Sequence, residues 1–235
     1  MKIEKIPKHV GIILDGNRRF AKKLMIKPWK GHDYGAKKVE KLVNWAIEYK
    51  IKELTLYTLS IQNFSSRPKK ELNYLLNLFK KELKNLIHND KIKKQKIKIN
   101  FIGRLNLFDK DLQKLIKEIM NKTKNNNKLT INFAMAYGGK EEIIDAVKKI
   151  AQQVKKGKIN INKINEETFK DFLYLKSSPD LIIRTGGEKR TSNFLNYQSA
   201  YSEWIFLDIM WPEFKKKDFV KCLNEYSKRK RRFGV

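Results

Sequence analysis

The chain has 235 residues, of which 41% are hydrophobic and 33% charged, so it is long enough for one substantial core and too apolar for a disordered protein. Its formal net charge of +28 is compatible with nucleic acid, an anionic membrane surface or a phosphate-bearing substrate, and does not choose between them. No window approaches the roughly 20 apolar residues of a membrane span and the N-terminus does not resemble a signal peptide, so we expect a cytoplasmic protein.

Six apolar, β-branched or aromatic runs predict strands, at residues 9–14, 53–58, 97–102, 129–135, 180–184 and 204–208. Apolar residues at three-to-four spacing predict one long helix within 67–87, with Pro68 near its first turn, and two further helices at 112–120 and 139–154. Strands that alternate with helices predict a single α/β domain, residues 1–235, with a central, mostly parallel six-stranded sheet flanked by helices.

Ligands of such sheets bind beyond the carboxyl ends of the strands. Glycine, arginine, serine and asparagine follow five of the six predicted strands, at 15–19, 60–68, 103–104, 137–139 and 184–194. Glycines allow backbone amides to approach a ligand, and arginine binds phosphate oxygens in pairs. The sequence therefore predicts a phosphate-bearing ligand at this edge.

Arginine is scarce in this chain, which has 44 lysines and only nine arginines. Six of the nine lie in the motif-like stretches: Arg18, Arg19, Arg67, Arg184, Arg190 and Arg232. Because the guanidinium fork suits phosphate better than a lysine point charge, this distribution supports phosphate binding. Chance clustering or structural ion pairs are the alternative explanation.

The residues that could hold a metal are few. One cysteine, Cys222, and three dispersed histidines give no zinc motif, and we expect Cys222 to be a packing residue. A Walker loop, a Gly-x-Gly-x-x-Gly after the first strand and a DDxxD cluster are all missing from the sequence. Asp15 and Glu203 are isolated carboxylates among cations, which suits Mg²⁺ shared with substrate phosphates, although each could simply balance a neighbouring arginine.

Several motifs together resemble the cis-prenyltransferases of the undecaprenyl diphosphate synthase family. They are HVGIILDGNRRFAKK from His9, Gly31-His32, TLYTLSIQNFSSRP from Thr55, AYGG from Ala136, DLIIRTGGEKRTSNFL from Asp180 and the terminal RRFG. The resemblance runs in order from His9 to Gly234. It implies a Mg²⁺-dependent prenyltransferase that condenses isopentenyl diphosphate repeatedly onto an allylic starter, farnesyl or geranylgeranyl diphosphate. The product would be a long-chain, undecaprenyl-like polyprenyl diphosphate, a precursor of glycosyl carrier lipid.

The resemblance also implies roles for individual residues. Asp15 would place the metal with Glu203, and Asn63 with Ser60 would assist proton removal. The remaining residues matched to the family's substrate-binding positions are Gly16, Asn17, Arg18, Arg19, Phe20, His32, Ile61, Gln62, Phe64, Arg67, Arg184, Arg190, Thr191, Ser192, Arg232 and Gly234. In the family the Arg-x-Gly tail contacts isopentenyl diphosphate in the partner's site, so we expect a homodimer.

A growing polyprenyl chain needs a long apolar tunnel, which we expect between the sheet and the helices. The apolar stripes at 72–87 and 112–120 could supply two of its walls, or could be ordinary core. The water-insoluble product leaves a peripheral contact with the membrane open.

Three features depart from the common family pattern. The segment 60–68 carries one extra residue, which makes the alignment of Arg67 less secure; Lys27 or Lys30 stands where an arginine is usual; and Lys189 replaces a histidine. These features are closer to archaeal members, some of which start from geranylgeranyl diphosphate.

Two other classes of function are less well supported. A non-catalytic partner subunit would have lost the aspartate motif, which this chain keeps at Asp15. A nucleic-acid binder is not expected, because the lysines are spread over the whole chain as in a solvated surface.

Overall fold

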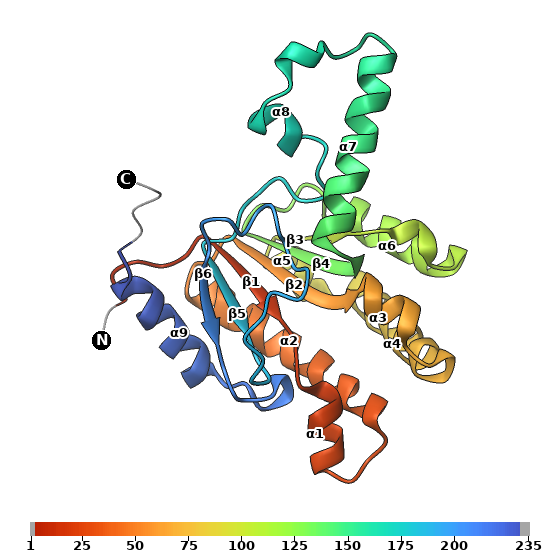
Figure 1. The fold of residues 1–235 in the computed structure, drawn as a ribbon. Helices are drawn as coiled ribbons and strands as arrows, with labels where there is room; N and C mark the ends of the chain where they lie inside the picture. The colour runs from red at the N-terminus through yellow and green to blue at the C-terminus, as the bar shows by residue number, and fades with distance from the viewer. Residues whose placement is uncertain (1–2, 231–235) are drawn as a thin grey trace.

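Six parallel strands form one sheet at the centre of the computed structural model, which describes residues 3–230 (Figure 1). The strands are β1 (His9–Ile13), β2 (Glu53–Ser60), β3 (Ile97–Ile102), β4 (Leu129–Tyr137), β5 (Leu181–Arg184) and β6 (Glu203–Phe206), in the spatial order β3-β4-β2-β1-β5-β6. Every neighbouring pair is parallel, which confirms the predicted fold class. All the carboxyl ends therefore lie at one edge.

The helices follow the strands as the periodicity predicts. The elements are α1 (Asn17–Lys23), α2 (Gly31–Glu48), α3 (Ile61–Ser66), α4 (Lys69–Ile87), α5 (Asp90–Lys94), α6 (Lys110–Thr123), α7 (Gly139–Lys155), α8 (Glu166–Lys170) and α9 (Lys216–Lys228). Helices α4, α6 and α7 match the three predicted helices, and Pro68 is the residue before α4, where its missing N–H costs no hydrogen bond.

The two faces of the sheet are covered differently. Side chains such as Val10 and Ile12 of β1 point toward one face, where they share a core with buried residues of α2, α4, α6 and α9. The intervening Ile13 belongs to a smaller core on the other face, which includes Phe194 and Leu195 from the irregular segment after β5. Cys222 of α9 is 1% exposed in the larger core, as expected, and burial raises the pKa of its thiol to about 12.

Helix α7 extends well beyond the sheet and carries α8 beside its far part, so the two form an arm at one end of the molecule (Figure 1). Helix α1 lies at the opposite end of the same view. No helix among residues 3–230 is long and apolar enough to cross a membrane.

The apolar stripe of α6 is ordinary core. Leu112, Ile116 and Ile119 are at most 2% exposed and pack in the main core, where α6 contacts α4 and β3. None of them lines the large cavity described below. Of the two possibilities that the sequence left open for this stripe, ordinary core is the one that the structure shows.

Candidate active site

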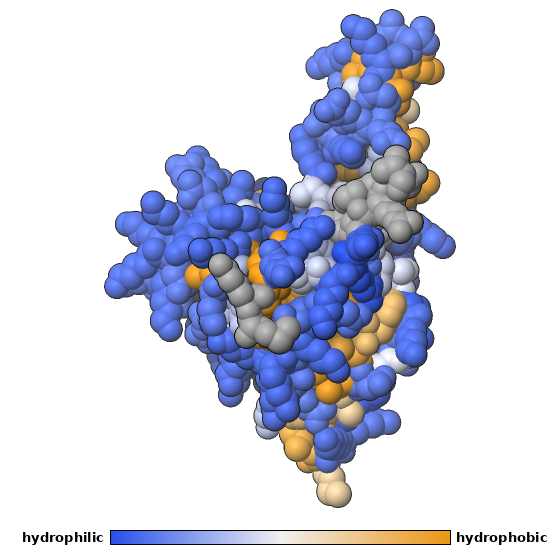
Figure 2. All heavy atoms as spheres, turned by 90° about the vertical axis from the view of Figure 1, so that its left-hand side faces the viewer, coloured by the Kyte–Doolittle hydropathy of each residue, from blue (hydrophilic) through white to orange (hydrophobic). Residues whose placement is uncertain are grey.

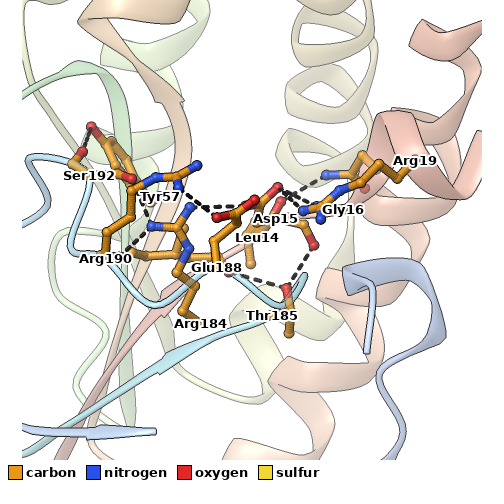
Figure 3. Close-up of polar contacts among 12 residues, drawn as sticks. Leu14, Asp15, Gly16, Arg19, Tyr57, Arg184, Thr185, Glu188, Arg190 and Ser192 are labelled. Atoms are coloured by element: carbon orange, nitrogen blue, oxygen red, sulfur yellow. Dashed lines mark hydrogen bonds and ion pairs between the residues drawn. The ribbon is translucent and has the colours of Figure 1, made fainter. Parts of the chain in front are cut away.

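Asp15 lies two residues beyond the end of β1 and is the anionic centre of the site (Figure 3). Its Oδ1 accepts hydrogen bonds from the backbone N–H of Gly16 at 2.6 Å and from Arg19 Nη2 at 3.1 Å, and its Oδ2 accepts one from Arg184 Nη2 at 3.0 Å. Gly16 has φ +104°, a conformation that side chains rarely tolerate, and it turns the chain from β1 into α1. The carboxylate is thus held between two guanidinium groups.

Arg184 is the last residue of β5 and is only 4% exposed. Because β1 and β5 pair in register at Ile13 and Arg184, this guanidinium lies directly beside the start of the Asp15 loop. Its Nη1 donates to the backbone carbonyl of Arg190 and, at 2.7 Å, to Ser192 Oγ. One buried cation therefore connects the loop after β1 to the loop after β5.

The loop after β5 has an unusual backbone where it meets Arg184. Ser192 and Asn193 have φ values of +50° and +64°, in the left-handed region that residues other than glycine seldom adopt. The hydroxyl of Tyr57 on β2 donates to the carbonyl of Ser192 at 3.3 Å, and Arg190 Nη1 donates to Glu188 Oε2 at 2.6 Å (Figure 3). These contacts hold Arg190 and Ser192 at the carboxyl edge of the sheet.

Two glycines of α2 allow α1 to begin where it does. A Cβ on Gly31 would lie 1.9 Å from the carbonyl oxygen of Asn17, and one on Gly35 would lie 2.3 Å from Asn17 Oδ1. The Asn17 side chain in turn donates to the carbonyl of Leu14 at 2.9 Å. Glycine is thus required at both positions, because it lets α2 approach α1 closely enough to place Asn17 in the site.

A second charged cluster lies between α2 and the start of α4. Glu71 is 3% exposed, and its Oε1 lies 3.0 Å from Arg67 Nη1 and 3.6 Å from Arg18 Nε. Arg67 Nη1 also donates to His32 Nε2 at 3.0 Å, which leaves the proton of the neutral ring on Nδ1. Burial, and then the charges of Arg67 and Arg18, lower the pKa of His32 to about 4. His32 is therefore neutral at pH 7.

One cavity of about 1360 Å³ joins these clusters to an apolar space. At the carboxyl edge of the sheet it is lined by the polar loops, including Asp15, Arg18 and Arg184. Away from that edge its walls are apolar side chains of α2, α4, β3 and β4, namely Val39, Val43, Leu75, Leu78, Phe79, Leu83, Leu86, Ile97, Ile99, Phe101, Ile131, Phe133 and Met135. It ends among polar side chains such as Asn85, Asn89 and Gln95 near α5. The cavity is thus cationic at one end and apolar along its length.

Most of the predicted site residues line this cavity. They are Asp15, Gly16, Asn17, Arg18, Arg19, His32, Ser60, Gln62, Asn63, Arg67, Arg184, Arg190, Thr191 and Ser192. Ser60 is the N-cap of α3, and its hydroxyl oxygen accepts from the backbone N–H of Asn63 at 3.0 Å. Arg232 and Gly234 lie outside the described residues.

Three predicted substrate-binding residues do not line the cavity. Phe20 packs edge-to-face on Tyr34, with ring centroids 5.2 Å apart. Ile61 is buried in the main core, and Phe64 packs against that core and on Phe108. These side chains pack on neighbouring residues of the fold, and their role in substrate binding stays a prediction.

The predicted phosphate-binding loops after β3 and β4 contribute little or nothing to the cavity lining. The same holds for Lys27 and Lys30, which stand where the family usually has an arginine. Arg104, after β3, forms a two-pronged contact with Asp145 of α7 at 3.0 Å, and after β4 only Lys140 reaches the cavity. Lys27 and Lys30 do not line the cavity, and Lys30 lies over the ring of Tyr74. The loops after β1, β2 and β5 therefore supply most of the polar end.

Glu203 lies at the wrong edge of the sheet to join Asp15 within one chain. It pairs with Leu181 at the start of β5, whereas Asp15 follows the residue that pairs with Arg184 at the end of β5. Three residues of strand separate these positions, about 10 Å at roughly 3.3 Å per residue. Glu203 Oε2 instead accepts from Arg229 Nη1 at 2.7 Å. Glu203 and Asp15 therefore do not meet within one subunit, and a shared role in holding a metal stays a prediction.

The donor set at Asp15 fits Mg²⁺ only together with a phosphorylated substrate. Among residues 3–230 no group of three or more His, Cys, Asp or Glu side chains could hold a metal alone. Asp15 supplies one partly exposed carboxylate among cations that attract phosphates. Mg²⁺ characteristically takes one or two carboxylates and completes its shell with water and substrate phosphate oxygens, so this site suits it.

Two residues of the site were not predicted from the sequence. Glu71 could have been suspected from its position four residues after Arg67, a spacing that brings side chains together on one turn of a helix. Tyr57 lies within the second predicted strand, where an apolar run gives no sign that its hydroxyl reaches the carbonyls of Tyr137 and Ser192. The partners of both residues become visible only in three dimensions.

Comparisons with known proteins agree with this geometry. A model of the family described as putative undecaprenyl diphosphate synthase matches residues 13–234. A tritrans,polycis-undecaprenyl-diphosphate synthase (geranylgeranyl-diphosphate specific) of Methanopyrus kandleri is 45% identical over 236 residues, covering 100% of this chain and 87% of that protein. The protein of the same description from Methanocaldococcus jannaschii is 46% identical over 98% of this chain and 84% of its own length.

Solved structures show the same fold. A lavandulyl diphosphate synthase from Lavandula x intermedia, in complex with dimethylallyl diphosphate, superposes with a TM-score of 0.93 at 33% identity, covering 98% of this chain and 99% of the other. A probable undecaprenyl diphosphate synthase from Campylobacter jejuni gives a TM-score of 0.81 at 30% identity, covering 98% and 100%. These similarities confirm the fold and the family predicted from the motifs.

We expect His32 to make stability sensitive to acid. The folded protein keeps this ring neutral down to about pH 4, whereas in the unfolded chain it takes up a proton near pH 6.5. The unfolded state therefore binds more protons between these values, and the free energy of unfolding falls as the pH drops through them, by roughly 3 kcal/mol at most. The contribution is fully present above pH 6.5. Urea unfolding at several pH values should show that the free energy of unfolding of His32→Asn falls less with decreasing pH than that of the wild type. Substitution of the exposed His88 should leave the wild-type pH dependence unchanged.

Proposed function

This chain belongs to the undecaprenyl diphosphate synthase family of cis-prenyltransferases and elongates prenyl chains in cis, and we propose that it starts from geranylgeranyl diphosphate. The relatives from Methanopyrus kandleri and Methanocaldococcus jannaschii are both described as specific for that starter. The observation that carries the proposal is the cavity of about 1360 Å³, with a cationic end for a diphosphate and a long apolar wall for a hydrocarbon chain.

The cationic end offers two neighbouring groups of diphosphate ligands. Around the loop after β1, the backbone N–H groups at the start of α1 and the side chains of Arg18 and Arg19 would hold the starter's diphosphate. Arg190 and Ser192, joined to this loop through Arg184, would hold isopentenyl diphosphate. Because two diphosphates bring several negative charges together, a site so rich in cations and so poor in carboxylates suits them.

The reaction then requires cleavage of the starter's carbon–oxygen bond, whose electron pair leaves with the diphosphate. The double bond of isopentenyl diphosphate supplies the electron pair of the new carbon–carbon bond, and loss of a proton restores a double bond. Fixed guanidinium groups stabilise the charge that develops on the departing diphosphate. Mg²⁺ held by Asp15 and the diphosphates would supply further charge neutralisation.

Proton removal has no strong base in this site. Asn63 and Ser60 line the cavity, but a carboxamide and a hydroxyl are poor proton acceptors. We infer that they orient the proton-bearing carbon and that a diphosphate oxygen takes the proton. His32, neutral and with Nδ1–H as its donor, would contact the starter's diphosphate without adding charge.

The starter proposal is tested by incubating the purified protein with Mg²⁺, radiolabelled isopentenyl diphosphate and geranyl, farnesyl or geranylgeranyl diphosphate in turn. We expect the highest kcat/KM with geranylgeranyl diphosphate, and long-chain products of the undecaprenyl class on reversed-phase separation. A clear preference for farnesyl diphosphate would contradict the proposed starter while leaving the family assignment in place.

Asp15→Asn should lower kcat roughly a hundredfold or more, because it keeps an oxygen acceptor for Arg184 but removes the charge that would hold Mg²⁺. Steady-state turnover in Mg²⁺, with a thermal melt to check folding, measures this. Asp111→Asn is the matched control, since Asp111 is exposed on α6 and should retain full activity. Wild-type turnover of Asp15→Asn would remove Asp15 from the mechanism.

Phe79→Ala should lengthen the products or broaden their distribution, because Phe79 of α4 lines the apolar part of the cavity. The matched control is Ile116→Ala on α6, which should cost on the order of 2–5 kcal/mol of stability and leave the product lengths unchanged. Product lengths and melting temperatures of both variants measure the two effects. An unchanged product profile for Phe79→Ala, with a lowered melting temperature, would assign Phe79 to the core instead.

We also propose a homodimer. Ile144 and Val147 are about half exposed one turn apart on α7, an apolar face that a second copy of the chain would cover. The described chain ends beside Glu203, because Arg229 is bonded to it, at the sheet edge opposite Asp15. Arg232 lies outside the described residues. We infer that Arg232 and Glu203 serve a partner's site, because Glu203 lies away from Asp15 within its own chain.

Mixing two inactive proteins tests the shared site. In a mixed dimer of Asp15→Asn and Arg232→Ala, one site lacks both groups, while the other combines an intact Asp15 loop with an intact partner tail. Activity should therefore reappear when subunits exchange. If the tail serves its own subunit, every site stays defective and the mixture remains inactive.

A further inference from the structure

The turn that follows α1 exposes apolar side chains at a strained position. We call residues 22–30 the basic turn. Its Met25 is 96% exposed and Leu24 is 43% exposed. Met25 also has φ +55°, a left-handed conformation that costs a bulky residue energy. An exposed apolar side chain and a strained backbone at one residue are two unfavourable features that folding alone does not explain.

The charged residues of the segment that carries these side chains are all cationic. Residues 16–30 contain six lysines and arginines and no aspartate or glutamate. Within the basic turn, Lys22, Lys23, Lys27 and Lys30 are exposed. Lys23 has an acidic partner, Glu213 at 2.7 Å, but that leaves a clear excess of positive charge around Leu24 and Met25.

Partly exposed aromatic side chains occur close to the apolar pair in the chain. Trp29 is partly exposed, and Lys27 Nζ lies 5.8 Å from its ring centroid. Tyr34, 45% exposed, packs edge-to-face on Phe20 of α1. Tryptophan and tyrosine favour the boundary between hydrocarbon and lipid headgroups, and lysines favour the phosphates above it. The segment thus offers the three kinds of side chain that a bilayer surface accepts.

The position of the turn suits such a surface. Helix α1 and the basic turn lie at the end of the molecule opposite the α7–α8 arm (Figure 1). The space-filling view shows apolar surface among hydrophilic side chains at this lower end (Figure 2). Lys22 of the turn also lines the cavity beside Arg18 and Arg19, so a bilayer under the turn would lie close to the reaction site.

We propose that the basic turn docks on an anionic lipid bilayer, with Leu24 and Met25 inserted below the headgroups and the lysines on lipid phosphates. This goes beyond the proposed function and rests on it only in that the product is a lipid. A protein partner is less well matched, because every charged residue of the turn is cationic and the apolar tip is only two residues wide. Insertion of a small apolar tip together with anionic attraction gives reversible binding, weakened by salt.

The test is flotation of the full chain with vesicles of phosphatidylcholine alone or mixed with phosphatidylglycerol. We expect binding to the mixed vesicles, little binding to phosphatidylcholine, and loss of binding as salt rises to about 0.5 M. The double variant Leu24→Ser/Met25→Gly should bind about tenfold more weakly, because it removes the inserted side chains. Glycine at position 25 also suits the left-handed backbone, so the variant should fold.

Ile161→Ser is the matched control, because Ile161 is 67% exposed beyond α7, far from the basic turn, and its loss should leave flotation unchanged. Turnover without vesicles should be equal in all these proteins, so failure of the docking proposal is separate from failure of the enzymatic one. Equal flotation of the wild type and the double variant would overturn the proposal. So would self-association of the wild type, measured by sedimentation, that the double variant loses, since a second copy would then be the occupant.

Discussion

The contact between Arg184 and Asp15 is the constraint on which the rest of the site depends. A guanidinium that is 4% exposed must have its charge compensated, and Asp15 Oδ2 at 3.0 Å provides that compensation across the ends of two paired strands. The same guanidinium binds the Arg190 carbonyl and Ser192 Oγ, so the two loops that we propose to bind the diphosphates are held in a fixed relation. Carbon–carbon bond formation needs its two substrates in such a relation, because misplacement by about 1 Å is costly to the rate.

The cavity combines environments that usually exclude one another. Its cationic end gathers like charges, and the buried carboxylate of Glu71 holds Arg67 and Arg18 together against their mutual repulsion. Its walls between α2, α4 and the sheet are mostly apolar side chains. A molecule with a diphosphate head and a hydrocarbon tail satisfies both ends at once, whereas a nucleotide or a simple lipid would satisfy only one. In the reaction that we propose, each condensation releases the starter's diphosphate and leaves the lengthened chain on the diphosphate that entered with isopentenyl diphosphate. That head would have to move to the starter's position before the next condensation, while the tail extends along the apolar walls.

In the dimer that we propose, the carboxyl edge of the sheet contributes to its own subunit's active site, and the opposite edge contributes to the partner's. In parallel sheets the carboxyl edge gathers the loops, and here it holds Asp15, Arg184 and the cavity mouth. Glu203 and Arg229 are bonded to each other at the other edge, close to where the described chain ends. Within one chain these groups face away from the chemistry. In the dimer that we propose, this edge meets a second subunit.

Local signals in the sequence were enough to predict the strands, the main helices and the polar loops after β1, β2 and β5, because hydrophobic periodicity and glycine-arginine clusters depend only on neighbouring residues. It also determined the family, since its motifs run through almost the whole chain. It could not decide which aromatic residues of those motifs face the ligand: Phe20 and Phe64 pack behind the site, a choice made by helix orientation. Nor could it decide that Glu203 lies away from Asp15, or that α4 and not α6 lines the cavity. These outcomes depend on strand register and on the order of packed layers, which bring together residues far apart in the chain and leave no trace in local spacing.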